Sequence, residues 1–122
     1  MYEVILYEDA RGKCPVQELI DNLEGRATKG EKDARVQLKQ IFMRIRFLEN
    51  LGTRSSNDTT KHIEDGIWEL RTGKNRILFF IWTDSTIVLL HAFRKTTNTT
   101  PKKEIDKAKR ERNYWKTYHG DK

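Results

Sequence analysis

The sequence predicts an α+β fold in which an antiparallel sheet carries its helices packed on one face, in the order β-α-α-β-β-β-α. Three observations support this prediction. An apolar stripe at helical spacing runs through residues 31–50. Three runs rich in β-branched and aromatic residues follow, joined by links too short for helical crossovers. A Thr-Pro pair then opens a final helix rich in lysine.

The first half of the chain contains one expected strand and two expected helices. Residues 2–7 favour a strand because they are rich in β-branched and aromatic side chains. Pro15 suits the first turn of a helix, and apolar residues recur at helical spacing from there to about Leu23. In the second helix, residues 31–50, the apolar stripe that we expect in the core consists of Ala34, Leu38, Ile41, Phe42, Ile45 and Leu48.

The second half begins with a polar loop, residues 52–60, and continues as two hairpins and a helix. The expected strands are residues 66–71, 76–83 and 86–94. Thr100 has a side chain that commonly caps helices, and Pro101 suits the first helical position. We therefore expect a basic C-terminal helix at about residues 101–116, within a single domain that spans residues 1–122.

The net charge of +6 comes entirely from the C-terminal quarter of the chain. Residues 1–93 contain equal numbers of basic and acidic side chains, whereas the excess of lysine and arginine lies in residues 94–122. A basic segment of this kind indicates a polyanion or an acidic protein as partner. A solvated helix that aids solubility is the alternative interpretation.

Cysteine and histidine are too scarce to suggest disulfide or metal chemistry. Cys14 is the only cysteine, which is typical of a reducing cytoplasm. The cysteine and the three histidines show no metal-ligand spacing, so we expect no metal site. No apolar run near the N-terminus is long enough for a signal peptide or a membrane span. We therefore expect a cytoplasmic protein with no membrane partner.

The short links between the three strands predict which residues face one another. If residues 72–75 close the first hairpin, Arg71 lies opposite Arg76, and opposed residues point to the same face of the sheet. If residues 84–85 close the second, the expected pairs are Trp82 with Ile87 and Leu78 with His91. Any even loop length preserves this sorting of residues between the two faces.

The sorting predicts one apolar face and one divided face. The apolar face, which we expect the helices to cover, consists of Trp68, Leu70, Ile77, Phe79, Ile81, Val88, Leu90 and Ala92. The second face consists of Ile67, Glu69, Arg71, Arg76, Leu78, Phe80, Trp82, Ile87, Leu89, His91, Phe93 and Lys95. One end of this second face is apolar, and the other end gathers its charged side chains.

Two arginines on adjacent strands repel each other, so their pairing needs an explanation. In one interpretation, Glu69 and other carboxylates simply neutralise Arg71 and Arg76. In the other, the two guanidinium groups bind a phosphate, whose oxygens they match two at a time and whose developing charge they stabilise during phosphoryl chemistry. Lys95, at the end of the next strand on the same face, adds a third cation.

The same region carries a recognisable pattern. GIWELRTGKNRILFF, followed by IVLLHAFRKTTNTTPKKEIDKAKRERNYW, closely resembles the HigB-like toxins of the RelE/ParE superfamily, in its phage-derived branch. The shared features are a Trp-Glu-Leu-Arg strand, an Arg-Ile strand, and a leucine-rich strand that ends in His-x-Phe-x-Lys and leads to Thr-Pro. The resemblance covers about residues 62–115.

The resemblance implies the toxin of a type II toxin–antitoxin pair, a ribosome-dependent mRNA endonuclease (an mRNA interferase) that inhibits translation. In such enzymes the RNA 2′-hydroxyl attacks the adjacent phosphate, so no metal or other cofactor is needed. The implied partners are the ribosome, mRNA and a helix-turn-helix antitoxin of the HigA-like kind, in a hetero-oligomeric complex.

The resemblance also implies roles for individual residues. Arg71 and Arg76 would stabilise the phosphorane, and Lys95 would protonate the 5′-oxygen or contact phosphate. The general base is open, because RelE-type toxins have a lysine-rich strand where this chain has Ile67 and Glu69. His91 and Glu69 are both candidates, since imidazole titrates near neutrality and a carboxylate accepts protons. Alternatively, His91 only packs and Glu69 is the salt-bridge partner of Arg71.

Further basic and aromatic residues are candidates for contact with nucleic acid. The basic candidates are Lys61, His62, Lys74, Lys102, Lys103 and Lys107. The aromatic candidates, which would stack on bases or seat an antitoxin segment, are Phe80, Trp82 and Phe93.

Two other functions fit the same sequence. A ParE-like toxin would inhibit DNA gyrase without cleaving RNA, and a basic binding module would use its arginines only to position phosphates. The clustering of Arg71, Arg76 and Lys95 favours the nuclease.

Overall fold

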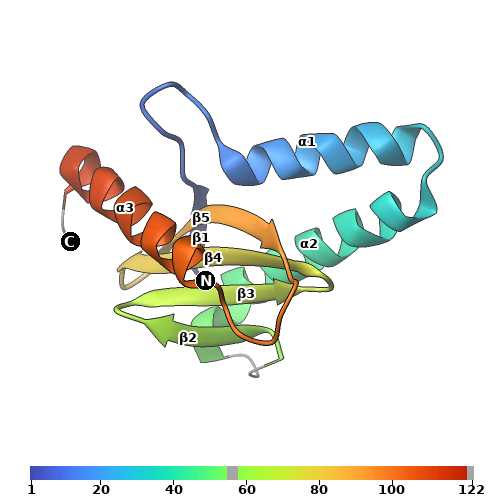
Figure 1. Ribbon diagram of the computed structural model, residues 1–122. Helices are drawn as coiled ribbons and strands as arrows, with labels where there is room; N and C mark the ends of the chain where they lie inside the picture. Colours follow the sequence, from blue (N-terminus) through green and yellow to red (C-terminus); the bar gives the residue numbers. More distant parts are fainter. Residues whose placement is uncertain (55–57, 121–122) are drawn as a thin grey trace.

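The computed structural model of the chain describes residues 1–54 and 58–120 (Figure 1). The elements are β1 (Glu3–Leu6), α1 (Pro15–Thr28), α2 (Lys32–Leu51), the 3-10 helix η1 (Gly52–Arg54), β2 (Thr60–Glu64), β3 (Ile67–Thr72), β4 (Asn75–Thr83), β5 (Thr86–Arg94) and α3 (Lys102–His119). The strands form one sheet in the order β1-β5-β4-β3-β2. This mixture of helices and a mainly antiparallel sheet confirms the predicted α+β class.

The sheet is antiparallel except at one edge. β1 lies parallel to β5, with Glu3 opposite Thr86 and Leu6 opposite Leu89. The other neighbouring strands pair in antiparallel fashion. A parallel pair needs a long connection, and here that connection contains α1, α2 and three strands. The sheet therefore departs from the predicted antiparallel pattern where the first strand lies beside the last.

β2 is a strand that the sequence analysis did not predict. It forms at the end of the expected polar loop, where Thr60 pairs with Leu70 and Lys61 with Glu69 of β3. Its sequence, Thr-Lys-His-Ile-Glu, lacks a regular apolar alternation because it lies at the edge of the sheet and most of its side chains are exposed. Part of the predicted loop, residues 55–57, lies outside the described residues.

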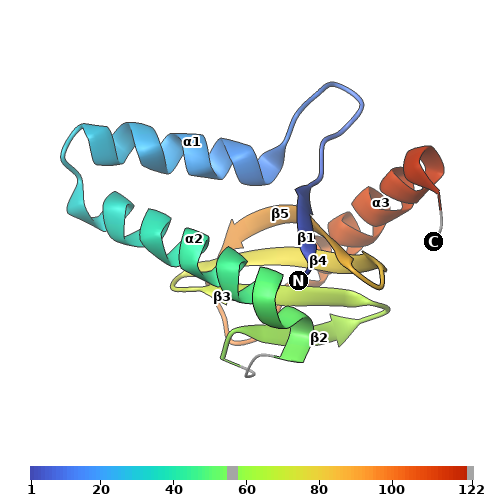
Figure 2. The same cartoon turned by 180° about the vertical axis from the view of Figure 1, so that it is seen from behind.

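Helices cover both faces of the sheet, so the prediction that they pack on one face is wrong. α2 lies across one face and α1 packs beside it, whereas α3 lies across the other, as the two opposite views in Figures 1 and 2 show. The second face carries the fully buried Ile67, Leu78 and Phe80, which pack with Ala108 and Trp115 of α3. An apolar sheet surface of this kind must be shielded from water. α3 shields it, although this helix is mostly charged and has few apolar residues.

A β-bulge in β5 reverses part of the predicted sorting of side chains. Leu78 pairs with His91 as predicted, but Phe79 pairs with Leu89, which leaves Leu90 as an extra residue. An extra residue resets the alternation of the strand beyond it. Ile87 and Leu89 therefore join the α1–α2 core, whereas Val88 and Leu90 join the α3 core. For the same reason Ile81, and not Trp82, lies opposite Ile87, although the predicted turn at residues 84–85 is confirmed.

α2 buries a narrower stripe than the sequence analysis predicted. Ala34, Ile41 and Leu48 recur every seven residues and are fully buried. Phe42 lies about 100° further round the helix and is half exposed, so its assignment to the core was wrong. The polar residue Gln37, which was not predicted to be in the core, is buried. Among the described residues, no helix is long and apolar enough to cross a membrane.

Candidate active site

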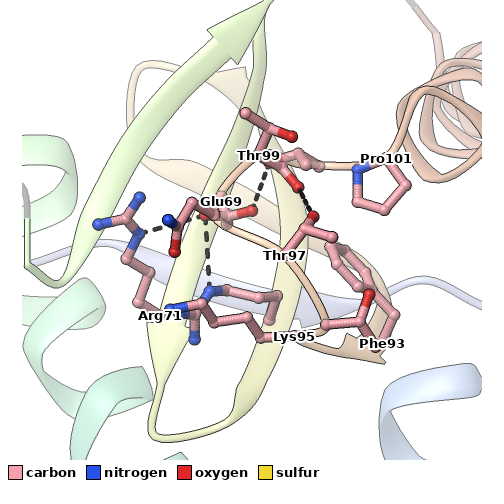
Figure 3. A pocket seen from close by; sticks show the side chains of 11 residues that line it. Glu69, Arg71, Phe93, Lys95, Thr97, Thr99 and Pro101 are labelled. Carbon is pink, nitrogen blue, oxygen red and sulfur yellow. Dashed lines mark hydrogen bonds and ion pairs between the residues drawn. The ribbon is translucent and has the colours of Figure 1, made fainter.

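A polar pocket of about 220 Å³ lies where β3, β4 and β5 approach the segment that leads into α3. Its lining comprises Glu69, Arg71, Arg76, Phe93, Lys95, Thr96, Thr97, Asn98, Thr99, Thr100 and Pro101. Figure 3 shows Glu69 between Arg71 and the threonine-rich segment. Cations thus lie on one side of the pocket and hydroxyl groups on the other.

The β3–β4 hairpin places the two arginines side by side. Arg71 lies opposite Arg76, as predicted, and Thr72 lies opposite Asn75, so residues 73–74 form a two-residue turn. Gly73 has a φ of 60°, a left-handed conformation that favours glycine. A side chain at Gly73 would also overlap that of Gln40 on α2. The local sequence therefore sets the register that brings the guanidinium groups together.

Glu69 is the centre of the polar network. Its carboxylate is almost fully buried, and its Oε1 atom lies 3.2 Å from Arg71 Nε and 3.7 Å from Arg76 Nε. The Thr100 hydroxyl donates a hydrogen bond of 2.7 Å to Glu69 Oε2. Thr100 was predicted to cap the last helix, but α3 starts at Lys102 without a side-chain cap. The hydroxyl instead ties the entry of α3 to β3, which closes one side of the pocket.

Arg76 is held by its own hairpin. Its Nη1 atom donates to the Gly73 carbonyl at 2.7 Å and to the Asn75 carbonyl at 3.0 Å. Burial lowers the pKa of the Arg76 guanidinium, Glu69 partly raises it, and Arg71 lowers it further. The ordinary pKa of arginine is so far above neutrality that Arg76 keeps its charge. A fixed cation that is mostly shielded from water is well suited to stabilise an anion.

Buried side chains anchor this hairpin to α2. Asn75 Nδ2 donates to Gln37 Oε1 at 3.0 Å, and Gln37 Nε2 donates to Asp33 Oδ2 at 2.6 Å. Both amide side chains are buried, so this bond forms away from competing water. This contact could not be predicted from the sequence, because the polar position in α2 gives no sign of its distant partner.

Lys95 lies at the mouth of the pocket. Its backbone N–H donates to the Lys74 carbonyl at 2.8 Å, which extends the contact between β5 and the β3–β4 turn. Its side chain is exposed and lines the pocket. Arg94, the residue before it, instead borders a separate depression with Pro15 and Arg26 of α1. Adjacent basic residues therefore serve different surfaces.

His91 lies outside the pocket. Its ring is buried beneath α3, with Nδ1 2.5 Å from Glu111 Oε1 and Nε2 3.1 Å from Glu104 Oε1. Both ring nitrogens are thus engaged by carboxylates of α3. His91 keeps its predicted place opposite Leu78, on the face of the sheet that α3 covers, and it does not line the pocket. We therefore assign His91 to the attachment of α3 and not to proton transfer.

Replacing His91 with leucine tests this assignment. We expect a loss of about 2–4 kcal/mol in the free energy of unfolding, because buried carboxylate groups lose their partner. Urea unfolding followed by circular dichroism measures the change. A second variant, His91→Leu combined with Glu111→Gln, should recover part of the loss because one orphaned charge is removed. A folded His91→Leu protein that had lost a pocket activity shown by the parent would contradict the assignment.

The structure separates the two predicted basic residues of β2. Lys61 lies opposite Glu69, so it shares the face of the sheet that carries the pocket, and it is exposed. His62 lies opposite Trp68 on the other face, where the two rings meet edge to face with centroids 5.1 Å apart. Lys61 remains near the candidate site, whereas His62 faces the α2 side of the sheet.

The predicted lysines of the hairpin and of α3 are also divided. Lys74 is exposed in the turn beside Gly73, outside the pocket lining. Lys102 and Lys103 are exposed in the first turn of α3, directly after the pocket residue Pro101. Lys107 lies one turn further on and borders a separate depression with Tyr7 and Arg110. The start of α3 thus extends the positive surface, and Lys107 faces elsewhere.

α3 covers two of the three aromatic residues that were predicted to stack on bases or to seat an antitoxin segment. Phe80 is buried in the α3 core. Trp82 packs edge to face against Trp115 and donates its Nε1–H to the Gly120 carbonyl at 2.8 Å. Phe93 alone among the three lines the pocket. The expectation of an open aromatic face was therefore wrong, because the apolar end of that face is where α3 docks.

Comparisons with known proteins add a family assignment. The family model described as "Phage derived protein Gp49-like (DUF891)" matches residues 31–113, more than half of the chain. The search of curated proteins found no significant match. Among solved structures, a chain of the "YoeB-YefM complex from Staphylococcus aureus" is similar, with a TM-score of 0.48 and 8% sequence identity. The alignment covers 80% of this chain and 99% of that chain.

Proposed function

The chain belongs to the family of phage-derived Gp49-like proteins, and we propose that it is the toxin of a toxin–antitoxin pair that cleaves mRNA. The observation that carries this proposal is the pocket that Arg71, Arg76 and Lys95 line together with the buried carboxylate of Glu69, which lies beside both arginines. The sequence resemblance to HigB-like toxins, on which these same positions coincide with the catalytic ones, supports it. A pocket of this size and charge suits a phosphodiester group.

The proposed reaction needs only groups that the RNA and the pocket supply. The ribose 2′-hydroxyl loses its proton to Glu69 and attacks the adjacent phosphorus. Arg71 and Arg76 stabilise the negative charge that builds up on the phosphorane oxygens. The bond from phosphorus to the 5′-oxygen then breaks, and Lys95 donates a proton to that oxygen. The products are a 2′,3′-cyclic phosphate and a free 5′-hydroxyl.

The pocket favours Glu69 over His91 as the general base. Among the described residues that line the pocket, Glu69 supplies the carboxylate, and no histidine lines it. Glu69 Oε1 faces both guanidinium groups, so a phosphate bound to the arginines comes within reach of the same carboxylate. Proton transfer requires such close approach.

Cleavage of defined RNA tests the proposal. Purified protein is mixed with ribosomes that carry a labelled mRNA, and the product ends are identified by mass. We expect a 2′,3′-cyclic phosphate at the cut, and no cut where the scissile ribose lacks its 2′-hydroxyl. Cleavage of the deoxy substrate would contradict the chemistry. Inhibition of DNA gyrase without RNA cleavage would place the protein with ParE-like toxins, and RNA binding without cleavage would make it a binding module.

The proposed partners follow from the same assignment. The excess positive charge of residues 94–122 suits the phosphate backbone of mRNA and of the ribosome. An antitoxin of the HigA-like, helix-turn-helix kind would hold the toxin silent in a hetero-oligomeric complex. Such an antitoxin would be encoded next to this protein, which sequencing of the neighbouring reading frames checks directly.

A further inference from the structure

α2 exposes an unusual amount of apolar surface. Eight large hydrophobic residues are exposed in the described part of the chain, and five of them lie on this one helix. They are Val36, Phe42, Met43, Phe47 and Leu51, with exposed fractions between 37% and 53%. Single exposed apolar side chains are ordinary, whereas a cluster of them indicates an interaction surface.

Four of these residues form a continuous stripe. Val36, Met43, Phe47 and Leu51 are spaced by seven, four and four residues, which places them along one side of a helix. The fully buried residues of α2 point to the opposite side, into the core. Figure 2 shows α2 in front of the sheet, and no other helix or strand of the described residues lies over it. We call these four residues the outer stripe.

Positive charge borders the outer stripe along one side. Arg35, Lys39 and Arg46 are exposed and follow one another at helical spacing, with Phe42 among them. No aspartate or glutamate occurs between Ala34 and Leu48, so this part of α2 has no acidic residue of its own to balance them. We call these three residues the basic flank.

We infer that the outer stripe and the basic flank together bind an acidic, amphipathic helix of a partner protein. Apolar residues at helical spacing on one helix match the apolar face of another. Glutamate or aspartate beside that face would lie against the basic flank, which gives the complex charge complementarity. This binding surface is separate from the candidate active site and does not depend on RNA cleavage.

Other occupants suit this surface less well. A second copy of the chain, related by a two-fold axis, would bring one basic flank towards the other. Single-stranded RNA binds by stacking on successive planar side chains, and within the outer stripe only Phe47 has a planar ring. An anionic membrane surface would attract the basic flank. However, α2 is already packed on the sheet, so it cannot lie in a membrane as a separate amphipathic helix would.

Binding of a designed peptide tests the inference. The probe is a fluorescent peptide of about 18 residues, long enough to form a helix, with leucine along one face and glutamate elsewhere. The control peptide has the same composition with the leucines scattered. We expect the first peptide to bind the full-length protein at least about tenfold more tightly than the control peptide. Fluorescence anisotropy measures both affinities, at low and at high salt.

Variants of the protein locate the binding surface. Met43→Ser combined with Phe47→Ser should weaken binding of the striped peptide about tenfold, because two central apolar contacts are lost. Lys39→Glu combined with Arg46→Glu should weaken it at low salt and reverse its dependence on salt, because the two new carboxylates repel the glutamates of the peptide. The matched control, Tyr118→Ser, removes an exposed aromatic residue from α3 and should leave binding unchanged. All of these side chains are exposed, and thermal unfolding checks that each variant folds.

Four results would overturn the inference. These are equal affinity for the two peptides, unchanged affinity in the Met43 and Phe47 double variant, binding of RNA at this surface, and binding to vesicles of anionic lipid but not to the peptide. Light scattering tests a fifth contradicting result, a parent protein that is a dimer and a double variant that is a monomer. The outer stripe would then bind a second copy of the chain.

Discussion

Replacing Arg76 with alanine is expected to lower the rate of RNA cleavage by about 10²- to 10³-fold, and with it the toxicity of the protein. The guanidinium group is held by two turn carbonyls and by Glu69, so its charge is fixed before the substrate arrives. Without this preorganised cation, the negative charge on the phosphorane loses the positive charge that stabilises it. Cleavage of ribosome-bound mRNA, followed as a time course, measures the rate.

The matched control is Arg94→Ala. Arg94 carries the same charge and lies next to Lys95 in the sequence, but its side chain borders α1 and not the pocket. We expect its cleavage rate to stay within about twofold of the parent rate, because only long-range electrostatics change. Arg76→Lys should be intermediate, since lysine keeps the charge but loses the two-point contact with phosphate. If Arg94→Ala were as inactive as Arg76→Ala, the general positive charge of the surface, and not the pocket, would carry the activity.

Stability must be measured alongside activity, because the Arg76 side chain is mostly buried. Loss of its hydrogen bonds to the turn should reduce the free energy of unfolding by about 1–2 kcal/mol. A loss of this size leaves most molecules folded and does not explain a hundredfold change in rate. A larger loss would require the activity to be corrected for the folded fraction.

Replacing Glu69 with glutamine is expected to have opposite effects on rate and on RNA affinity. The cleavage rate should fall by about 10²- to 10³-fold, because an amide does not take the proton of the 2′-hydroxyl. RNA should bind as tightly as before or more tightly, because a negative charge between two arginines has been removed. Single-turnover kinetics give the rate, and fluorescence anisotropy with a 2′-deoxy substrate gives the affinity.

This divergence distinguishes a catalytic role from a structural one. If Glu69 only positioned the arginines, Glu69→Gln would weaken both cleavage and binding. Glu64→Gln is the matched control, because Glu64 pairs with Lys109 on the surface and does not line the pocket. Thr100→Val tests the connection to α3: if the hydroxyl helps to hold the carboxylate, this variant should reduce the rate less than Glu69→Gln does.

The sequence predicted the elements that depend on local patterns. The pairing of Arg71 with Arg76 followed from the short link between two strong strand signals, and the structure confirms it. The clear periodicity of residues 31–50 likewise predicted α2 nearly to its ends. Both features are determined by residues close together in the chain, which is why sequence patterns report them well.

Features that depend on distant residues could not be predicted in this way. The bulge at Leu90 leaves no mark in an unbroken apolar run, because Ile87, Val88, Leu89 and Leu90 are equally suited to either face. α3 packs on the sheet surface that the other helices leave uncovered. The predicted alternation of side chains did not include the bulge, so it assigned part of that surface incorrectly. The buried bond from Asn75 to Gln37 joins residues of two elements that only the folded chain brings together.

The parallel pairing of β1 with β5 has a consequence for the order in which the molecule assembles. The residues that line the pocket all lie between Glu69 and Pro101, so the hairpins that form it close short loops. Glu3 instead meets Thr86, which lies far along the chain, after both helices of the first half and three further strands. Loop-closure entropy grows with the length of the loop, and contacts between distant residues slow folding. We therefore expect the arginine-bearing hairpin to form early in folding, and the N-terminal strand to complete the sheet in a later step.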